Sequence, residues 1–398
     1  MCNAMMNRFA IIGVGKTPQG KIPMRSAASF HVEACVRAIQ DAGLKKEDID
    51  GLFLYRHFDA LPGDVDVSAF TVAEQLGIRP TVLSQETYCT RSWLTHAIGL
   101  LYTGVCKYVL VSYGDNGRSG RRTFVNELSG DEPTNELAAH GDFSTMAKYA
   151  MIARKAMHLT GTGPDVWRVI AVMQRQFAAL NPDANMHGKQ LSYEDYDNSG
   201  MLVDPFRLYD ATPITDGGRA IILSKAEHAG EAKSKPVYIR GFGAANMPKS
   251  SSQMTFDDTR YAAKTASAQA LEMAEVCHDD IDSCQIYDCF TYTVEATLRD
   301  YGFFKEGQSQ EFITPHVIGP KGSMPVNTSG GMLSEGYFMG LTPVTEAVLQ
   351  LRGECGDRQL GGGIVGSKTP ELILCSDNGG VFQSHCTLVL GKEAPCIR

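Results

Sequence analysis

The sequence predicts an α/β protein that is built from two related halves. β-prone and helix-prone segments alternate along most of the 398 residues, which is the pattern of sheets covered by helices. A segment near the N-terminus also recurs after residue 236, with strand, helix and strand in the same order. A long segment that occurs twice indicates a duplicated domain rather than a solenoid.

Matching residues define this repeat. Gly15, which follows the first β-prone run, matches Gly243 in the second copy. Tyr55, at the end of the next strand, matches Tyr287. The spacing between the two matches differs by a few residues, and a length difference in the intervening helical region explains it.

The repeat divides the chain into two predicted domains. Residues 6–230 form the N-terminal half and residues 236–398 form the C-terminal half. The first half also contains an excursion of loops and helices at about residues 117–209. Loops on a rigid scaffold usually shape a binding site, so we expect this excursion to contribute to substrate binding.

Composition excludes several classes of function. The chain is 43% hydrophobic and 21% charged, with a net charge of −8 and no run of Lys or Arg, so nucleic acid is not an expected partner. No apolar run approaches the roughly 18 residues that a membrane span needs, and no signal peptide is recognised. The eleven cysteines include no Cys-x-x-Cys pair. We therefore expect reduced thiols, no metal site and a cytoplasmic location.

Cys89 is the first candidate catalytic residue. A β-prone run at residues 81–84 precedes it, and Leu94, Ile98 and Leu101 follow at helical spacing. Cys89 is therefore predicted at a helix N-terminus, where free N–H groups and the helix dipole favour a thiolate. A thiolate there could accept an acyl group. The alternative is a buried structural thiol, because free cysteines are among the most buried residues.

Two glycine-rich stretches of the second half are further candidates. Residues 325–340 contain Gly330 and Gly331, which permit close backbone approach to a ligand and open a predicted helix with free N–H groups. Residues 372–380 contain Cys375 at the end of a hydrophobic strand, where a second thiol could donate and accept a proton. The alternatives are a tight turn for the first stretch and a buried core cysteine for the second.

Together these features resemble the thiolase superfamily, and most closely its SCP2-thiolase and lipid-transfer-protein branch. The resemblance rests on the duplicated halves, the junction at Cys89, the Tyr-Asp-Cys-Phe sequence at residues 287–290 and the Asn-Thr-Ser-Gly-Gly sequence at residues 327–331. It implies a thiolase-like five-layer αβαβα fold and a homodimer. It also implies that Cys89 is a nucleophile at the end of a pantetheine tunnel.

The resemblance further implies ligands and a partner. Coenzyme A thioesters are the implied substrates, with coenzyme A as co-substrate and no cofactor bound by this chain. The implied partner is a small OB-fold, zinc-ribbon subunit of the DUF35 type, encoded separately, which would give a heterotetramer.

The sequence departs from a degradative thiolase near the glycine-rich turn. Such enzymes carry Gly-His-Pro there, whereas this chain has Gly336 followed by Tyr337 and Phe338. In a related group that has Tyr-x-His-Gly, the position of the His is occupied here by Met339. A standard straight-chain thiolase is therefore not expected.

The first functional hypothesis is a thiolase-type acyltransferase. It would cleave or form a C–C bond in a β-oxoacyl-CoA through an acyl-enzyme on Cys89, with His57 or Cys375 as the base. Asn327 and the backbone N–H groups near Gly331 and Gly380 would bind coenzyme A or hold the oxyanion. Bulky aromatic-rich loops suit a branched or aromatic substrate. This combination resembles benzoylsuccinyl-CoA thiolases of anaerobic aromatic degradation, and phloroglucinol-type acyltransferases are a variant.

Two other hypotheses remain open. The chain also resembles retro-aldolases of the steroid side-chain type, which transfer protons with two tyrosines and need no thiolate, and Tyr287 and Tyr337 lie in the matching motifs. Tyr287 could instead have a purely structural role as an aromatic residue at a strand end, because Tyr55 occupies the matching position in the first copy of the repeat. The third hypothesis is a non-catalytic acyl-CoA or lipid-binding protein.

Overall fold

The computed structural model describes residues 8–55, 67–86, 89–120, 144–249 and 254–392. For residues 86 and 89–93 the backbone alone is described. The strands form one large sheet in the order β3-β2-β4-β7-β1-β8-β11-β10-β9, together with a separate two-stranded hairpin of β5 and β6. The bounds of the strands in the large sheet are Phe9–Lys16 (β1), Gly51–Tyr55 (β2), Val82–Glu86 (β3), Tyr108–Asp115 (β4), Gly217–Lys225 (β7), Val237–Asn246 (β8), Ser283–Gln285 (β9), Leu372–Gly379 (β10) and Ser384–Gly391 (β11).

The sheet order is that of two similar half-sheets joined in the middle. In the first half β1 pairs antiparallel with β7, β7 with β4, and β4 parallel with β2. In the second half β8 pairs antiparallel with β11, β11 with β10, and β10 parallel with β9. A short antiparallel pairing of β1 with β8, through Ala10 and Ile11, connects the two.

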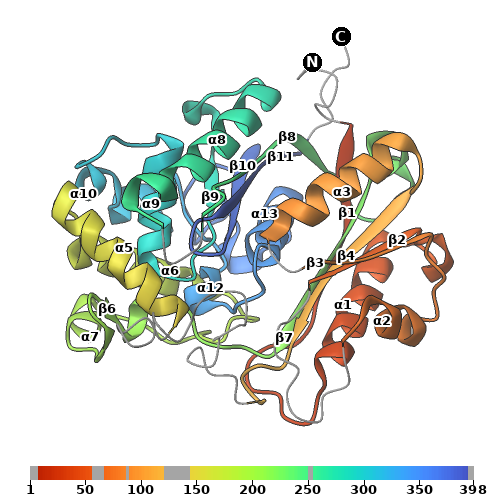
Figure 1. The fold of residues 1–398 in the computed structure, drawn as a ribbon, viewed down its shortest axis with the longest axis horizontal. Helices are drawn as coiled ribbons and strands as arrows, with labels where there is room; N and C mark the ends of the chain where they lie inside the picture. The colour runs from red at the N-terminus through yellow and green to blue at the C-terminus, as the bar shows by residue number, and fades with distance from the viewer. Residues whose placement is uncertain (1–7, 56–66, 87–88, 121–143, 250–253, 393–398) are drawn as a thin grey trace.

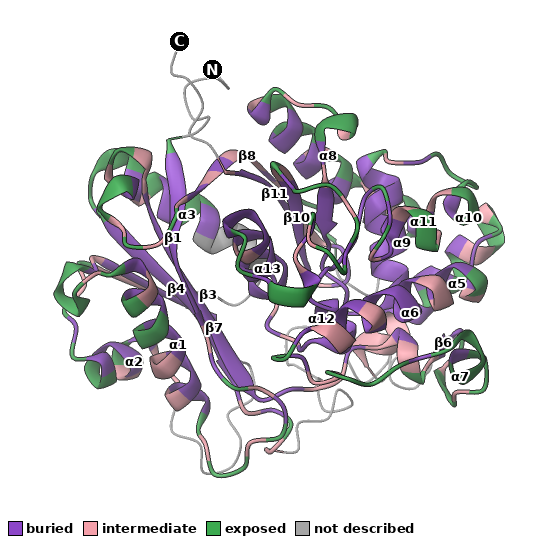
Figure 2. Cartoon of the chain, turned by 180° about the vertical axis from the view of Figure 1, so that it is seen from behind, coloured by how far each residue is buried: buried purple, intermediate pink, exposed green. Residues whose placement is uncertain are grey.

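The helices form three layers around these two half-sheets, as Figures 1 and 2 show. Helices α1 and α2 pack on the outer face of the first half, and α5, α6, α8 and α9 lie outside the second half. Helices α3 and α13 lie between the halves, in one hydrophobic cluster with strands of both. The bounds of these helices are Ala27–Ala42 (α1), Ala69–Leu76 (α2), Cys89–Thr103 (α3), Thr145–Thr160 (α5), Pro164–Leu180 (α6), Phe256–Ala274 (α8), Thr291–Tyr301 (α9) and Leu341–Arg352 (α13).

The central helical layer confirms the predicted five-layer αβαβα architecture. Leu94 and Ile98 of α3 and Val348 of α13 are fully buried in the cluster that also contains Val111 of β4 and Leu388 of β11. A helix that contacts a sheet on each side must be apolar around most of its circumference. This requirement explains why α13 is buried along nearly its whole length.

The glycines of the repeat have a common packing role. A Cβ atom at Gly15 would collide with the backbone carbonyl of Ala34 in α1, and one at Gly243 would collide with that of Ala266 in α8. The outer helix of each half therefore lies directly on its strand, which only glycine permits. The same device in both halves supports the interpretation of the sequence repeat as a duplication.

Shorter elements complete the described chain. None of the helices within the described ranges is long and apolar enough to cross a membrane. The excursion in the first half contributes α5, α6, α7 and the hairpin of β5 and β6, which cover the outside of the second half. The short elements are α7 (Tyr193–Asp197), β5 (Met201–Val203), β6 (Phe206–Arg207), α10 (Ser309–Phe312), α11 (Pro315–Ile318) and α12 (Gly331–Ser334).

A buried histidine makes the stability of this fold sensitive to mild acid. His385 of β11 is 1% exposed, and its Nε2 lies 2.6 Å from the hydroxyl of Tyr301. Burial lowers the pKa of His385 to about 3, whereas an unfolded histidine has a pKa of about 6.5. Below pH 6.5 the unfolded chain therefore binds more protons than the folded one, and stability falls as the pH falls toward 3.

We expect His385 to account for about 2 kcal/mol of the stability lost between pH 7 and pH 5. Urea unfolding of the wild-type protein and of His385→Gln at both pH values measures this contribution. The variant should lose about 2 kcal/mol less on acidification. An equal pH dependence in the two proteins would show that His385 does not titrate in this way.

Candidate active site

Two tyrosines from different segments meet at the end of the second half-sheet. Tyr287 follows β9 and Tyr337 follows α12. Their hydroxyl oxygens lie 2.9 Å apart, within hydrogen-bonding distance, and their rings meet edge to face with centroids 6.3 Å apart. Tyr287 is buried and Tyr337 is partly buried. The two residues that the retro-aldolase hypothesis requires are therefore brought together.

The chain around Tyr287 is fixed by hydrogen bonds at residues 286, 287 and 288. The backbone N–H of Tyr287 donates to Ser376 Oγ on β10 at 3.0 Å. The N–H of Ile286 donates to Asn327 Oδ1 at 2.6 Å. Asp288 Oδ1 accepts from the N–H of Met332 at 2.9 Å. These bonds fix the chain segment that carries the phenol, and a fixed position favours proton transfer between neighbouring groups.

The backbone on each side of Tyr337 is hydrogen-bonded to one threonine side chain. Thr342 Oγ1 accepts from the N–H of Phe338 and donates to the carbonyl of Gly336, each at 3.1 Å. The ring of Tyr113, which belongs to β4 of the first half, meets the ring of Tyr337 edge to face at 6.4 Å. The Tyr337 side chain therefore lies between a residue of the first half and Tyr287 of the second.

Burial determines the ionisation of Tyr287. Desolvation raises the pKa of Tyr287 well above its ordinary value, and the neighbouring Tyr337 raises it further. Tyr287 is therefore a neutral phenol at neutral pH. A neutral phenol that is hydrogen-bonded to a second phenol can accept a proton while it passes its own proton to its neighbour.

The predicted nucleophile lies at the junction that the sequence indicated. Helix α3 begins at Cys89, shortly after β3 ends at Glu86. The side chain of Cys89 lies outside the described residues, and so does the whole of His57. Their predicted roles as nucleophile and base stay predictions.

Cys375 lies inside β10 and is 1% exposed. Its sulfur lies 3.8 Å from the carbonyl oxygen of Pro343 at the start of α13. Burial raises the pKa of Cys375 well above its ordinary value, so the group is a protonated thiol at neutral pH. Its predicted role in proton exchange stays a prediction.

The glycine-rich stretch forms a tighter structure than predicted. The helix that Gly331 opens, α12, has only four residues, and the N–H groups of Met332 and Leu333 are not free because both donate to Asp288. The N–H of Gly331 lies 3.3 Å from Ser329 Oγ. A Cβ atom at Gly331 would collide with the Asp288 carboxylate, which explains the glycine there.

Two other residues, Asn327 and Gly380, were predicted to hold an oxyanion or to bind coenzyme A. Asn327 is buried, with φ of 56°, and its side-chain oxygen holds the backbone before Tyr287. Gly380 follows β10 and has φ of 59°, a conformation that favours glycine. Their role in binding a ligand stays a prediction.

Sequence reasoning did not single out Asp288 or Tyr113. Asp288 had a detectable signal, because a carboxylate three residues after a buried strand needs donors, and the helix start at Gly331 offers them. Tyr113 had none, because its contact with Tyr337 joins segments that are far apart in the sequence.

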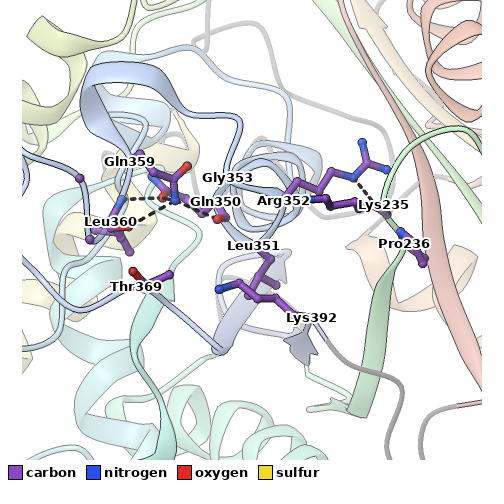
Figure 3. A pocket seen from close by; sticks show the side chains of 12 residues that line it. Lys235, Pro236, Gln350, Leu351, Arg352, Gly353, Gln359, Leu360, Thr369 and Lys392 are labelled. Carbon is purple, nitrogen blue, oxygen red and sulfur yellow. Dashed lines mark hydrogen bonds between the residues drawn. The ribbon is translucent and has the colours of Figure 1, made fainter.

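A separate cavity of about 380 Å³ lies at the other end of the second half-sheet (Figure 3). Its lining includes Thr369, shortly before β10 begins, and Lys392, directly after β11 ends. Arg352 at the end of α13 also lines it. None of the predicted site residues that the structure describes lines this cavity, and it is distinct from the tyrosine pair.

Comparisons with known proteins agree with this architecture. A family model described as Thiolase C-terminal domain-like matches residues 243–392. A 17-hydroxy-3-oxo-4-pregnene-20-carboxyl-CoA lyase of Mycobacterium tuberculosis is 31% identical over 88% of this chain and 92% of its own length. An acetyl-CoA acetyltransferase of Methanothermobacter thermautotrophicus is 29% identical over 91% and 95%. The solved structure of an Ltp2-ChsH2(DUF35) aldolase superposes with a TM-score of 0.84 at 27% identity, covering 98% of both chains.

The five layers, the duplicated halves and these relatives define an enzyme of the thiolase type. The chain belongs to the thiolase superfamily, within its SCP2-thiolase branch. This branch includes both acyltransferases and aldolases among the relatives of this chain, so the reaction has to be argued from the site itself.

Proposed function

We propose that this enzyme catalyses the retro-aldol cleavage of an acyl-CoA side chain that carries a hydroxyl group on its β carbon. The observation that carries the proposal is the 2.9 Å approach of the Tyr287 and Tyr337 hydroxyls. The similarity to the CoA lyase and to the aldolase structure supports it. In this proposal coenzyme A is the thioester part of the substrate, and no free coenzyme A is consumed.

The reaction needs one proton removed and one proton returned. The β-hydroxyl group gives its proton to one phenol of the pair while that phenol passes its own proton along the 2.9 Å hydrogen bond to the other phenol. The bond between the α and β carbons breaks, the β carbon becomes a ketone or aldehyde, and the electron pair moves into the thioester as an enolate. The other phenol protonates the α carbon of this enolate. The products are a carbonyl compound and a shortened acyl-CoA, and no water or oxidant is consumed.

A second candidate function is thiolase-type acyl transfer, and the position of Cys89 at the start of α3 favours it. A helix N-terminus stabilises a thiolate. In this reaction the thiolate attacks the β-oxo group of a β-oxoacyl-CoA, a shortened acyl-CoA leaves, and free coenzyme A then takes the acyl group from Cys89. A branched or aromatic acyl group, like that of benzoylsuccinyl-CoA, is the substrate proposed for this alternative. The non-catalytic hypothesis has less support, because the similar proteins described above are enzymes.

Replacement of Cys89 separates the two reactions. If aldol cleavage is the function, Cys89→Ala should retain kcat to within about threefold, because the proposed proton transfers involve only the tyrosines. The assay follows the carbonyl product released from a β-hydroxyacyl-CoA. A loss of more than a hundredfold would contradict this expectation. Thiolysis of a β-oxoacyl-CoA by the wild-type enzyme, with an acyl adduct on Cys89 seen by mass spectrometry, would favour acyl transfer.

We also propose an assembly for the active enzyme. The solved aldolase with a similar fold is described as a complex with a DUF35 protein, and a benzoylsuccinyl-CoA thiolase chain that is 26% identical to this one is described as a subunit. A small DUF35-type partner bound to a homodimer of this chain is therefore the proposed state. Co-expression with a neighbouring DUF35 reading frame, followed by mass measurement of the purified complex, tests it.

A further inference from the structure

A buried arginine contacts the residues on each side of Tyr337. Arg219 of β7 is fully buried. Its Nη2 donates to Glu335 Oε1 at 2.8 Å. Its guanidinium carbon lies 4.1 Å from the centre of the Phe338 ring, a cation–π contact. One side chain of the first half therefore contacts residues 335–338, here called the Tyr337 loop, both before and after the tyrosine.

Gln19 links Arg219 to the Tyr337 loop through two further hydrogen bonds. Gln19 accepts from Arg219 Nη2 at 2.7 Å, and its own amide nitrogen donates to the carbonyl of Glu335 at 3.1 Å. The Phe338 ring lies so close to β7 that a Cβ atom at Gly217 would come within 2.9 Å of it. The loop around Tyr337 is therefore anchored to the first half by an ion pair, an amide and a ring contact.

The partner of Tyr337 is anchored differently. The backbone N–H of Tyr287 is held by Ser376 and that of the preceding Ile286 by Asn327, and both acceptors belong to the second half. The distance between the two hydroxyls therefore depends on how the Tyr337 loop, tied to β7 of the first half, sits against the second half. Small errors in such a distance are costly, because misplacement of a reacting group by about 1 Å can lower a rate by about 10²-fold.

We infer that Arg219 is a positioning residue for catalysis, which sets the place of the Tyr337 hydroxyl through Glu335 and Phe338. This inference rests on the proposed function of the tyrosine pair. The side chain of Arg219 contacts Gln19 and the residues that flank Tyr337, so its proposed effect on the reaction is exerted through Tyr337.

The test compares Arg219→Met with Arg219→Lys and with Arg352→Met. Arg352 is also a buried arginine in an ion pair, with Asp41 at 2.8 Å, but it lies at the distant cavity. We expect Arg219→Met to lower kcat for β-hydroxyacyl-CoA cleavage by about 10- to 100-fold with little change in KM. Arg219→Lys, which keeps the positive charge, should recover part of the loss, and Arg352→Met should keep the wild-type kcat.

A double variant separates positioning from general damage to the fold. In a Tyr337→Phe background, Arg219→Met should cause no further loss of the residual kcat, because the hydroxyl that it positions is already absent. A further loss of tenfold or more there would overturn the inference, as would a wild-type kcat in folded Arg219→Met. If Arg219→Met does not fold, Glu335→Gln replaces it, with the same expected loss and the same contradicting result.

The outcomes also distinguish this inference from the proposed function. If Tyr337→Phe keeps full activity, the aldol mechanism fails, whatever Arg219 does. If Tyr337→Phe is inactive while the Arg219 and Glu335 variants are fully active, the mechanism stands and only the positioning role is wrong.

Discussion

The Tyr337→Phe variant is expected to cleave a β-hydroxyacyl-CoA with a kcat about 10²–10⁴-fold below that of the wild-type enzyme. This is the range that positioned acid–base groups contribute. The variant keeps the ring contacts with Tyr113 and Tyr287 but removes the hydroxyl that lies 2.9 Å from Tyr287. The measurement is the initial rate of carbonyl product formation at saturating substrate.

Two further variants make this result specific. Tyr287→Phe should lower kcat by a similar factor. The kcat of the double variant should be no lower than that of the less active single variant, because the effects of residues that act as one unit are not additive. Tyr196→Phe is the control: it removes a buried hydroxyl that donates to Asp210 at 2.7 Å and lies outside the proposed site. A wild-type kcat in Tyr337→Phe would refute the role of the pair.

The second large effect is expected on stability. Glu346 of α13 is buried and accepts from Arg358 Nη2 at 2.9 Å and from Thr328 Oγ1 at 2.8 Å. Glu346→Ala leaves the Arg358 guanidinium buried without an anion. Breaking a buried ion pair in this way costs about 3–5 kcal/mol. Urea unfolding at pH 7 should show a loss of that size.

The pH dependence of the Glu346 contribution has a defined sign. Burial raises the pKa of Glu346, but Arg358 and the hydrogen bonds outweigh it, so the pKa is lowered overall. The contribution is therefore complete above the unfolded pKa of about 4.3 and is lost as the pH falls through the lower folded pKa. The matched control is Glu354→Ala, at an exposed position just after the same helix, which should cost less than about 1 kcal/mol. Equal losses in the two variants would contradict the prediction.

Most of the fold could be predicted because it depends on patterns that local physics imposes. Alternating strands and helices predicted an α/β protein. Gly15 and Gly243 match each other because in each half the outer helix packs against the strand at backbone distance. The helix start at Cys89 was also predictable, since a β-prone run and a helical period meet there. The resemblance to a known family then supplied the five layers, which single-segment patterns do not determine.

The site was predictable only in part. The motifs that contain Tyr287 and Tyr337 stood out in the sequence, but their contact depends on how the two segments pack. The N–H groups near Gly331 were expected to be free. Those of Met332 and Leu333 instead donate to the carboxylate of Asp288, whose contact with them depends on tertiary packing. Arg219 gave no sequence signal, since its partners Glu335 and Phe338 are distant along the chain and no local pattern links them.

The most direct test of the proposed reaction is the consumption of free coenzyme A during cleavage. The assay supplies an acyl-CoA with a tertiary alcohol on its β carbon, together with measured free coenzyme A, to the enzyme and its DUF35-type partner. Retro-aldol chemistry by Tyr287 and Tyr337 predicts a ketone and a shortened acyl-CoA in equal amounts, with the free coenzyme A unchanged. No cleavage of this alcohol, together with thiolysis of a β-oxoacyl-CoA that consumes one free coenzyme A for each bond broken, would contradict the retro-aldol account and would indicate acyl transfer.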